Sequence, residues 1–586
     1  MKYNLNQLSK KQEKQSTIKA LKRLLNLISA EKRNLWLAIV IIMLNSGLLL
    51  LGPLLIGHTI DTYIRTKQFH GVLIFGGILL AIYLVAMITG YLQTKLMGSV
   101  GQRMLYTLRN AIFNKLQTLP VSFFNQNKAG DLISRVNNDT DKLNQFFSQS
   151  LVQFIGSLVT MVGAGIFLLS IHLELGIAAL LPAVLIVAFT MIFSPWVKKK
   201  NAVNLKSVGE LSAEIQESLN NFKVIIAFNR RDYFRRKFDD ANKENYKTAI
   251  GAGLANNIFV PVYGLFASAA QLIVLLFGIY LISKGNFTLG LLVSYIAYTT
   301  SFYNPLRQLA ALWTSFQVAM ASWDRISQIL LLESDLKQIE SDAITSSDAL
   351  LEFRNVHFSY DGTKEILHNV NLRFDKGKTY ALIGPTGGGK TTTASLISRL
   401  YDATKGTILL DGRDIRSFSD VERTQKIGFI LQEPFLFSGT VKDNILYGNS
   451  KLQNLSDEAL KQIIQDANLN EILAVFDEGL NTSISSASDG ISLGQKQLIA
   501  FMRAVLRNPE LLILDEATAN IDTITEQLLG NILNKLSKET TLVIIAHRLN
   551  TIENADEIYF VNEGEVQKAG TLTDALDMLL EGKRTS

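Results

Sequence analysis

Six apolar runs, each long enough to cross a lipid bilayer as a helix, lie before residue 320 of the 586-residue chain, and none follows. About 20 apolar residues are needed to span a hydrocarbon layer roughly 30 Å thick. The runs are approximately Leu35 to Ile56, Gly71 to Leu92, Leu151 to Ile171, Leu175 to Ser194, Ile258 to Ile282 and Thr288 to Trp313. The first part of the chain is therefore expected to be an all-α membrane domain of six helices.

The loops between these runs alternate between short and long. The two long loops, Lys95 to Ser150 and Pro195 to Asn257, are polar, helical in period and rich in Lys and Arg. Because basic loops stay in the cytoplasm, we expect a multi-pass protein of the cytoplasmic membrane with both long loops and both termini in the cytoplasm. The long loops should extend the membrane helices, with a turn and a short crosswise helix between Pro120 and Gly130.

Composition narrows the possible partners. The net charge of +6 comes from Lys and Arg gathered beside the apolar runs, where they act as topology signals, so no nucleic-acid partner is expected. The chain contains no Cys, which excludes disulfides, thiolate metal sites and a cysteine nucleophile. The polar, amphipathic start lacks the apolar core of a cleavable signal peptide, so the first membrane helix is expected to direct insertion.

The chain changes character near Ser347. There LEFRNVHFSY alternates apolar and polar residues as a half-buried strand does, after a polar connector. Strand-like runs such as TYALIG, LLILD and TLVIIAH then alternate with helical stretches, which is typical of an α/β domain on a largely parallel sheet. We therefore expect a cytoplasmic segment 1–34, a membrane domain 35–332, a linker 333–348 and an α/β domain 349–586.

The segment GPTGGGKT fits the P-loop pattern G-x-x-x-x-G-K-[ST] at each fixed position. A predicted strand precedes it and a helix follows, so backbone N–H groups and a helix N-terminus should converge on phosphate oxygens. Lys390 is expected on the β/γ-phosphates and Thr391 on Mg²⁺. The expected ATP contacts are Gly384, Pro385, Thr386, Gly387, Gly388, Gly389, Lys390, Thr391 and Thr392. A Gly-rich hairpin turn, the alternative, would not require Lys-Thr at its end.

Two acids end the predicted buried strand in LLILDEATAN. The carboxyl ends of parallel strands face the crevice where nucleotides bind. Asp515 is therefore expected to hold Mg²⁺ through water, and Glu516 to polarise the attacking water.

From the boundary onward the chain resembles the nucleotide-binding domain of ABC (ATP-binding cassette) transporters, with the motifs in the family's order. The resemblance implies that Tyr360 stacks on adenine and that Gln432, in FILQEPFLFSG, contacts Mg²⁺ and the attacking water. It implies that His547, in IIAHRL, orients Glu516, so that Glu516, His547 and Gln432 form the catalytic group. It also implies that Asp522 is the D-loop aspartate that crosses to a partner domain.

The membrane half resembles that of the family's exporters, in which six helices are fused ahead of the nucleotide-binding domain. The stretch FFNQNKAGDLISRVNNDTDKL, beginning at Phe123, resembles their first intracellular coupling region. The resemblance implies ATP-driven export of a hydrophobic or amphipathic small molecule or lipid by alternating access, with ATP and Mg²⁺ as cofactors. It also implies a dimer in contact with membrane lipids, because each ATP site of the family joins one domain's P-loop to the other's signature helix.

The signature departs from the family's LSGGQ. Here the sequence is ISLGQ, in which Ser492, Leu493, Gly494 and Gln495 would serve the partner's site and Leu493 replaces a glycine. A branched side chain there crowds a backbone that must approach phosphate closely. We favour a heterodimer with a second half-transporter and one degenerate site, over a homodimer that tolerates leucine.

Three competing functions are weaker. An ATP-gated channel or regulator would not need both Glu516 and His547, importers of the superfamily usually carry their domains on separate chains, and a nucleic-acid motor has no use for six membrane helices.

Tyr295, Tyr298 and Phe302 lie on one helical face of the sixth run and either line a cavity or pack against neighbouring helices. Arg307 likewise either meets a substrate or snorkels to the membrane edge.

Overall fold

A computed structural model of the chain describes residues 3–5, 31–340, 349–485, 490–515, 523–536, 540–545, 552–553, 555–570 and 573–578. These residues divide into two compact units. The helical unit comprises residues 31–116 and 130–331. The α/β unit comprises residues 3–5, 117–129 and the described residues from 332 onward.

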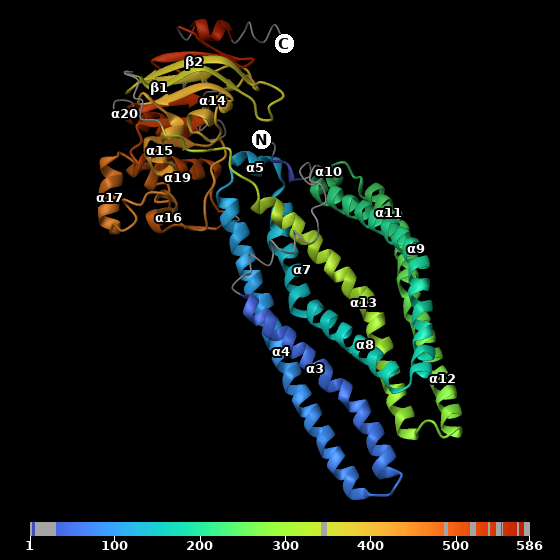
Figure 1. Cartoon of the computed structure of the whole chain (residues 1–586). Coiled ribbons are helices and arrows are strands. Elements are labelled where there is room, and N and C mark those ends of the chain that lie inside the picture. The colour runs from blue at the N-terminus through green and yellow to red at the C-terminus, as the bar shows by residue number, and fades with distance from the viewer. Residues whose placement is uncertain are drawn as a thin grey trace. The chain divides into compact units, whose positions relative to one another are not determined.

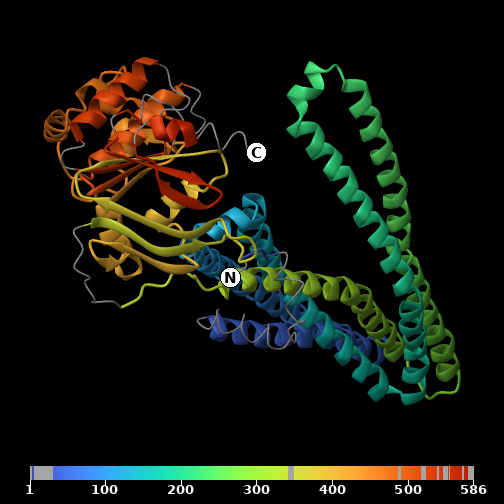
Figure 2. The same cartoon turned by 90° about the horizontal axis from the view of Figure 1, so that it is seen from above.

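Long helices build the helical unit (Figure 1). Its elements are α3 (Lys32–Thr59), η2 (Ile60–Ile64), α4 (Phe69–Gln117), α6 (Ala129–Ser134), η3 (Arg135–Asp139), α7 (Thr140–Gln145), η4 (Phe146–Ser150), α8 (Leu151–Ile171), α9 (Leu173–Asn220), α10 (Phe222–Ala227), α11 (Arg231–Asn257), α12 (Phe259–Ser283) and α13 (Leu289–Leu330). Helix α9 runs alongside α11 and α12, and α13 packs on α3, α8 and α12 (Figure 1 and Figure 2). As predicted, α4 and α9 continue well beyond the apolar runs that begin them.

Five helical stretches among the described residues are long and apolar enough to cross a membrane, judged by length and composition. They are Lys32–Ile64, Phe69–Gln117, Ala129–Ile171, Leu173–Asn220 and Arg231–Ser283. The sixth expected run lies in α13, which is a long helix but is not one of these five. Tyr, Thr, Ser and Asn side chains in its first half make it more polar than the others.

The aromatic face expected on α13 is used for packing. Tyr295 and Tyr298 are fully buried, and the hydroxyl of Tyr298 donates a 2.7 Å hydrogen bond to the backbone carbonyl of Leu50. The hydroxyl of Tyr295 donates to the carbonyls of Leu168 and His172. Buried hydroxyls need such partners in an apolar surrounding. The cavity-lining interpretation of these two tyrosines is therefore wrong, and the side chain of Arg307 lies outside the described residues.

The α/β unit contains two main sheets. The antiparallel sheet has the order β2-β1-β4-β5, from β1 (Ala349–Phe358), β2 (Leu367–Asp375), β4 (Lys405–Leu410) and β5 (Arg413–Asp414). The other has the order β12-β11-β3-β10-β9-β6, from β3 (Thr379–Ile383), β6 (Ile427–Ile430), β9 (Leu511–Asp515), β10 (Thr541–Ile545), β11 (Glu557–Asn562) and β12 (Glu565–Lys568). It is parallel except for β12, as the sequence predicts. Two short strands of two residues each, β7 (Gly439–Thr440) and β8 (Ser483–Ile484), form a separate antiparallel pair.

Helices surround these sheets. They are α5 (Val121–Gln126), α14 (Lys390–Ile397), α15 (Asp420–Lys426), α16 (Val441–Ile445), α17 (Asp457–Asp466), α18 (Asn470–Leu473), α19 (Leu493–Val505) and α20 (Thr523–Leu536), with the 3-10 turns η5 (Ile415–Ser417) and η6 (Gly479–Asn481). Strands β3, β9 and β10 are buried along their whole length and are neighbours at the centre of the parallel sheet. The short helix predicted between Pro120 and Gly130 is confirmed as α5, and its Phe123 is fully buried against Tyr3.

Candidate active site

The P-loop connects β3 to α14, as its sequence context predicts. Gly384, Gly387 and Gly389 have φ angles of +142°, +86° and +117°. Only glycine adopts such angles readily. A Cβ on Gly384 would lie 2.0 Å from the carbonyl oxygen of Val561, so the close approach of the two backbones also requires glycine there.

The first residues of α14 carry the polar groups of the site. The Nζ of Lys390 donates hydrogen bonds to the backbone carbonyls of Gly384 at 2.9 Å and Pro385 at 3.0 Å. The Oγ1 of Thr391 donates to Oδ1 of Asp515 at 3.4 Å. The structure therefore brings the P-loop and the first acid of LLILDEATAN together, although their positions in the sequence are far apart.

The sheet order explains this meeting. Strands β3, β10, β9 and β6 are parallel neighbours, so their carboxyl ends lie at one edge. Asp515 is the last residue of β9 and is 3% exposed. Gln432 follows β6 by two residues and is exposed at the same edge. Glu516 and His547 follow β9 and β10 in the sequence, but these two residues and Asp522 lie outside the described residues.

Tyr360 extends the site onto the antiparallel sheet. It follows β1, its side chain is 43% exposed, and its hydroxyl lies 3.0 Å from Oγ1 of Thr392 on α14. Its ring packs edge-on against Phe358 and Tyr401, with centroid distances of 4.8 Å and 5.1 Å. A supported aromatic ring with free surface beside the P-loop helix suits stacking on a purine base.

Tyr401 is a further residue of this site that no sequence motif indicated. Its hydroxyl accepts a 2.8 Å hydrogen bond from Nδ2 of Asn125 on α5, and burial raises the pKa of this phenol, so it stays protonated at neutral pH. A cavity of about 390 Å³ is lined by the two rings and by Ser122 of α5. The motif that begins at Phe123 contains Asn125, but no local pattern marks its partner, because Tyr401 lies much further along the chain.

The signature segment forms the start of α19. The Oγ of Ser492 accepts from the backbone N–H of Gln495 at 3.1 Å, and Oε1 of Gln495 accepts from the N–H of Ser492 at 2.9 Å. This capping box satisfies two N–H groups that the helix would otherwise leave unpaired. Leu493 is the first helical residue and is 40% exposed, whereas Gly494 is buried. The leucine therefore fits the helix and adds an apolar side chain at its exposed N-terminus.

The fold and the site define a P-loop ATPase that shares its chain with a membrane-spanning helical region. The family model of the ABC transporter transmembrane region matches residues 35–306, and the model described as ABC transporter matches residues 367–519. The chain is 33% identical over 561 residues to the uncharacterized ABC transporter ATP-binding protein YknV of Bacillus subtilis, covering 94% of this chain and 91% of the relative. The chain therefore belongs to the ABC transporter family, and the predicted membrane protein, fold class and ATPase are confirmed.

Two other relatives have more specific names. A fatty acid ABC transporter ATP-binding/permease protein of Mycobacterium bovis is 32% identical over 497 residues, covering 85% of this chain and 78% of the relative. A multidrug resistance ABC transporter ATP-binding and permease protein of Lactococcus lactis subsp. cremoris is 30% identical over 499 residues, covering 84% and 83%. Both are similar to this chain over its membrane helices as well as its ATPase region.

Proposed function

We propose that this chain is one half of a dimeric exporter that uses ATP hydrolysis to move a hydrophobic or amphipathic small molecule or lipid across the cytoplasmic membrane. The observation that carries this proposal is the meeting of Lys390, Thr391 and Asp515 at one sheet edge, in a chain that also carries membrane helices. The names of the fatty acid and multidrug relatives support the substrate class. In this proposal the domains have the boundaries expected from the sequence, and both termini lie in the cytoplasm.

ATP is held by residues 384–392, with Tyr360 against the base and Lys390 on the β/γ-phosphates. The oxygens of Thr391, Gln432 and Asp515 suit Mg²⁺, which binds proteins through few side chains together with substrate phosphates and water. Bound Mg²⁺ neutralises charge that develops on the transferred phosphoryl group.

Glu516 polarises the attacking water, His547 orients Glu516, and Gln432 contacts the water from the neighbouring strand end. Closure of two such domains around ATP is passed to the membrane helices through the coupling segments, and hydrolysis resets the cycle. Asp522 and the start of α19 contact the partner half. We propose a heterodimer, because the exposed Leu493 stands where the family's glycine lets a backbone approach phosphate.

The test is transport by the full complex in proteoliposomes, with ATP supplied on the side of the ATPase units. ATP-dependent accumulation of a fluorescent amphipath inside the vesicles is expected, and Glu516→Gln should abolish it. ATP-independent flux through the protein, or an ion current gated by ATP, would instead establish a channel and overturn the proposal.

A further inference from the structure

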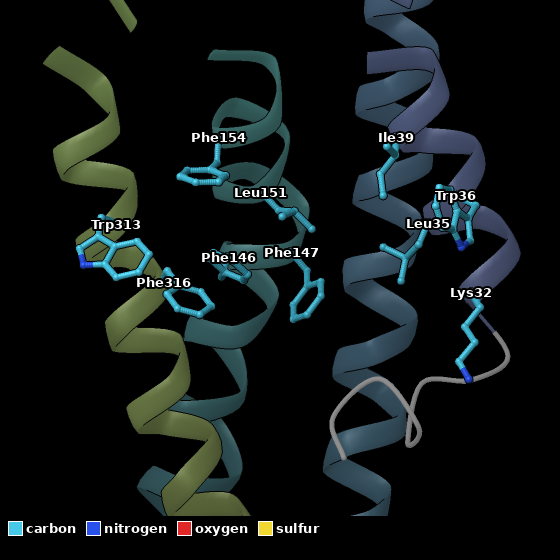
Figure 3. A pocket seen from close by; sticks show the side chains of 10 residues that line it. All are labelled: Lys32, Leu35, Trp36, Ile39, Phe146, Phe147, Leu151, Phe154, Trp313 and Phe316. Carbon is cyan, nitrogen blue, oxygen red and sulfur yellow. The ribbon is translucent and has the colours of Figure 1, made fainter. Parts of the chain in front are cut away.

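A half-open aromatic cavity of about 500 Å³ lies among the helices of the helical unit (Figure 3). Trp36 of α3, Phe146 of η4, Phe154 of α8, and Trp313 and Phe316 of α13 contribute to its lining. Their side chains come from the four elements α3, η4, α8 and α13 and gather in one space, whereas Lys32, at the start of α3, points away from the rings. The cavity is therefore apolar, with its one lysine at the end where α3 begins.

A polar cavity of about 410 Å³ lies further along the same helices. Among the residues whose side chains the structure describes, fourteen line it; nine of these carry an amide or a hydroxyl, and none of the fourteen is charged. The amide residues are Asn45, Gln93, Gln153, Asn304 and Gln308. On α3 this cavity uses residues near the middle of the span, where polar groups are costly without hydrogen-bond partners.

The two cavities share one helical face. Leu35 and Ile39 of the aromatic cavity are followed on α3 by Ile42, Ser46 and Leu49 of the polar cavity, at the spacing of three and four residues that keeps side chains on one face. On α13, Trp313 and Asn304 are nine positions apart, which corresponds to roughly 14 Å along a helix. An apolar space and a polar space are thus adjacent within reach of one small amphipathic molecule.

Hydrogen bonds between helices use only some of the polar side chains that line this cavity. Asn45 donates to the carbonyl of Ala86 at 2.6 Å and to Oγ1 of Thr89 at 2.8 Å, and Ser157 donates to Oε1 of Gln308 at 3.4 Å. In contrast, Oε1 of Gln93 is buried and has no hydrogen-bond partner among the described residues. The side chains of Asn304 and Gln308 are exposed to the cavity side of α13. Unused amide groups remain to bind a ligand.

We propose that the two cavities together bind an amphipath whose head is uncharged and rich in hydroxyl or amide groups. The head occupies the polar cavity and the apolar body occupies the aromatic cavity. An ionic head is disfavoured because the lining side chains that the structure describes offer it no counter-charge, and an unpaired charge is expensive to bury. This inference rests on the proposed function and names the substrate class more narrowly.

The test compares octyl glucoside, octanoate and octyltrimethylammonium, which share one chain length and differ in head charge. Stimulation of ATPase activity is measured for the full complex in nanodiscs, below the micelle concentration of each compound. We expect octyl glucoside to act at a concentration at least about tenfold lower than either charged compound. Equal or stronger stimulation by octanoate or octyltrimethylammonium would overturn the inference.

Variants locate the effect in the polar cavity. Gln308→Leu and Asn304→Leu each remove an exposed amide and should raise the half-stimulating concentration of octyl glucoside about tenfold. Gln271→Leu is the matched control, because Gln271 donates to Thr300 between α12 and α13 and lines neither cavity. An unchanged octyl glucoside response in both cavity variants would contradict the assignment, as would an equal loss in the control.

A binding measurement separates this inference from the proposed function. A brominated octyl glucoside should quench the fluorescence of Trp36 and Trp313, and unlabelled octyl glucoside should reverse part of this quenching by competition. The reversible part should be smaller in Trp36→Phe and in Trp313→Phe. It should be unchanged in the control Trp196→Phe. This readout does not need hydrolysis. Competable quenching without ATP-driven transport would contradict the proposed function alone, and Glu516-dependent transport without competable quenching would contradict this inference alone.

Discussion

The hydroxyl of Tyr401 accepts a 2.8 Å hydrogen bond from the side-chain amide of Asn125. The Tyr401 ring also packs edge-on against Tyr360, whose hydroxyl lies 3.0 Å from Oγ1 of Thr392. A short series of contacts therefore joins helix α5 to the P-loop helix through two tyrosines. If the Tyr360 ring stacks on the base as proposed, its movement on ATP binding is expected to reach α5 by this route.

Tyr401→Phe tests this connection, because it removes the hydrogen bond to Asn125 and keeps the ring that supports Tyr360. We expect ATP affinity to change less than about twofold, because the lost hydrogen bond is to Asn125 and not to the nucleotide, and the ring that supports Tyr360 remains. Substrate-stimulated ATPase activity should fall several-fold. Tyr559→Phe is the matched control, because its hydroxyl donates to the carbonyl of Arg373 in the same unit, away from α5. Unchanged stimulation in Tyr401→Phe would contradict the connection.

Tyr360→Ala should weaken ATP binding about tenfold or more, because aromatic stacking on a base contributes about 1 to 3 kcal/mol. Tyr360→Phe keeps the ring and loses only the contact with Thr392, so its affinity should stay close to that of the unmodified protein. Fluorescent nucleotide titration of the purified complex measures both. Equal losses in the two variants would show that the hydroxyl, and not the ring, holds the nucleotide.

Glu516→Gln should lower steady-state ATP hydrolysis at least about a hundredfold, because a positioned general base contributes about 10² to 10⁴ to the rate. ATP binding should persist, since the P-loop and Tyr360 remain intact. Phosphate release and nucleotide titration on the same sample give the two values. Near-normal turnover in this variant would remove Glu516 from the catalytic group.

Leu493→Gly should raise ATPase turnover several-fold if the leucine weakens the partner's site, because it removes the exposed side chain at the start of α19. The capping box between Ser492 and Gln495 does not involve Leu493, so the helix should still begin at the same place. Turnover that stays the same or falls would show that leucine is tolerated.

Native mass spectrometry of the chain, alone and with a candidate partner half, is the companion measurement for Leu493→Gly. A complex that hydrolyses ATP only with the partner supports the heterodimer. An active homodimer would contradict it while leaving the ATPase itself in place.

Local sequence patterns were sufficient to predict the membrane helices, the P-loop and the position of Asp515. The apolar runs predicted the long helices, because a helix satisfies its own backbone hydrogen bonds in lipid. GPTGGGKT predicted the P-loop, because the φ angles of its glycines and the approach of Gly384 to Val561 require glycine at those positions. Asp515 was predicted at the same edge because parallel strands end together. These predictions depend on period, length and residue type, which are properties of short segments.

The face that each helix turns toward its neighbours was decided by tertiary packing. The pattern of Tyr295 and Tyr298 favoured packing over a cavity without naming the partners, and both are buried because carbonyls of α3 and α8 are within reach of their hydroxyls. Asn125 and Tyr401 meet only because α5 packs in the α/β unit. The sequence alone determined an ATPase fused to membrane helices. The pairing of distant side chains, including those that line the two cavities, depended on how the helices pack, because contacts between distant segments leave no periodic pattern in the chain.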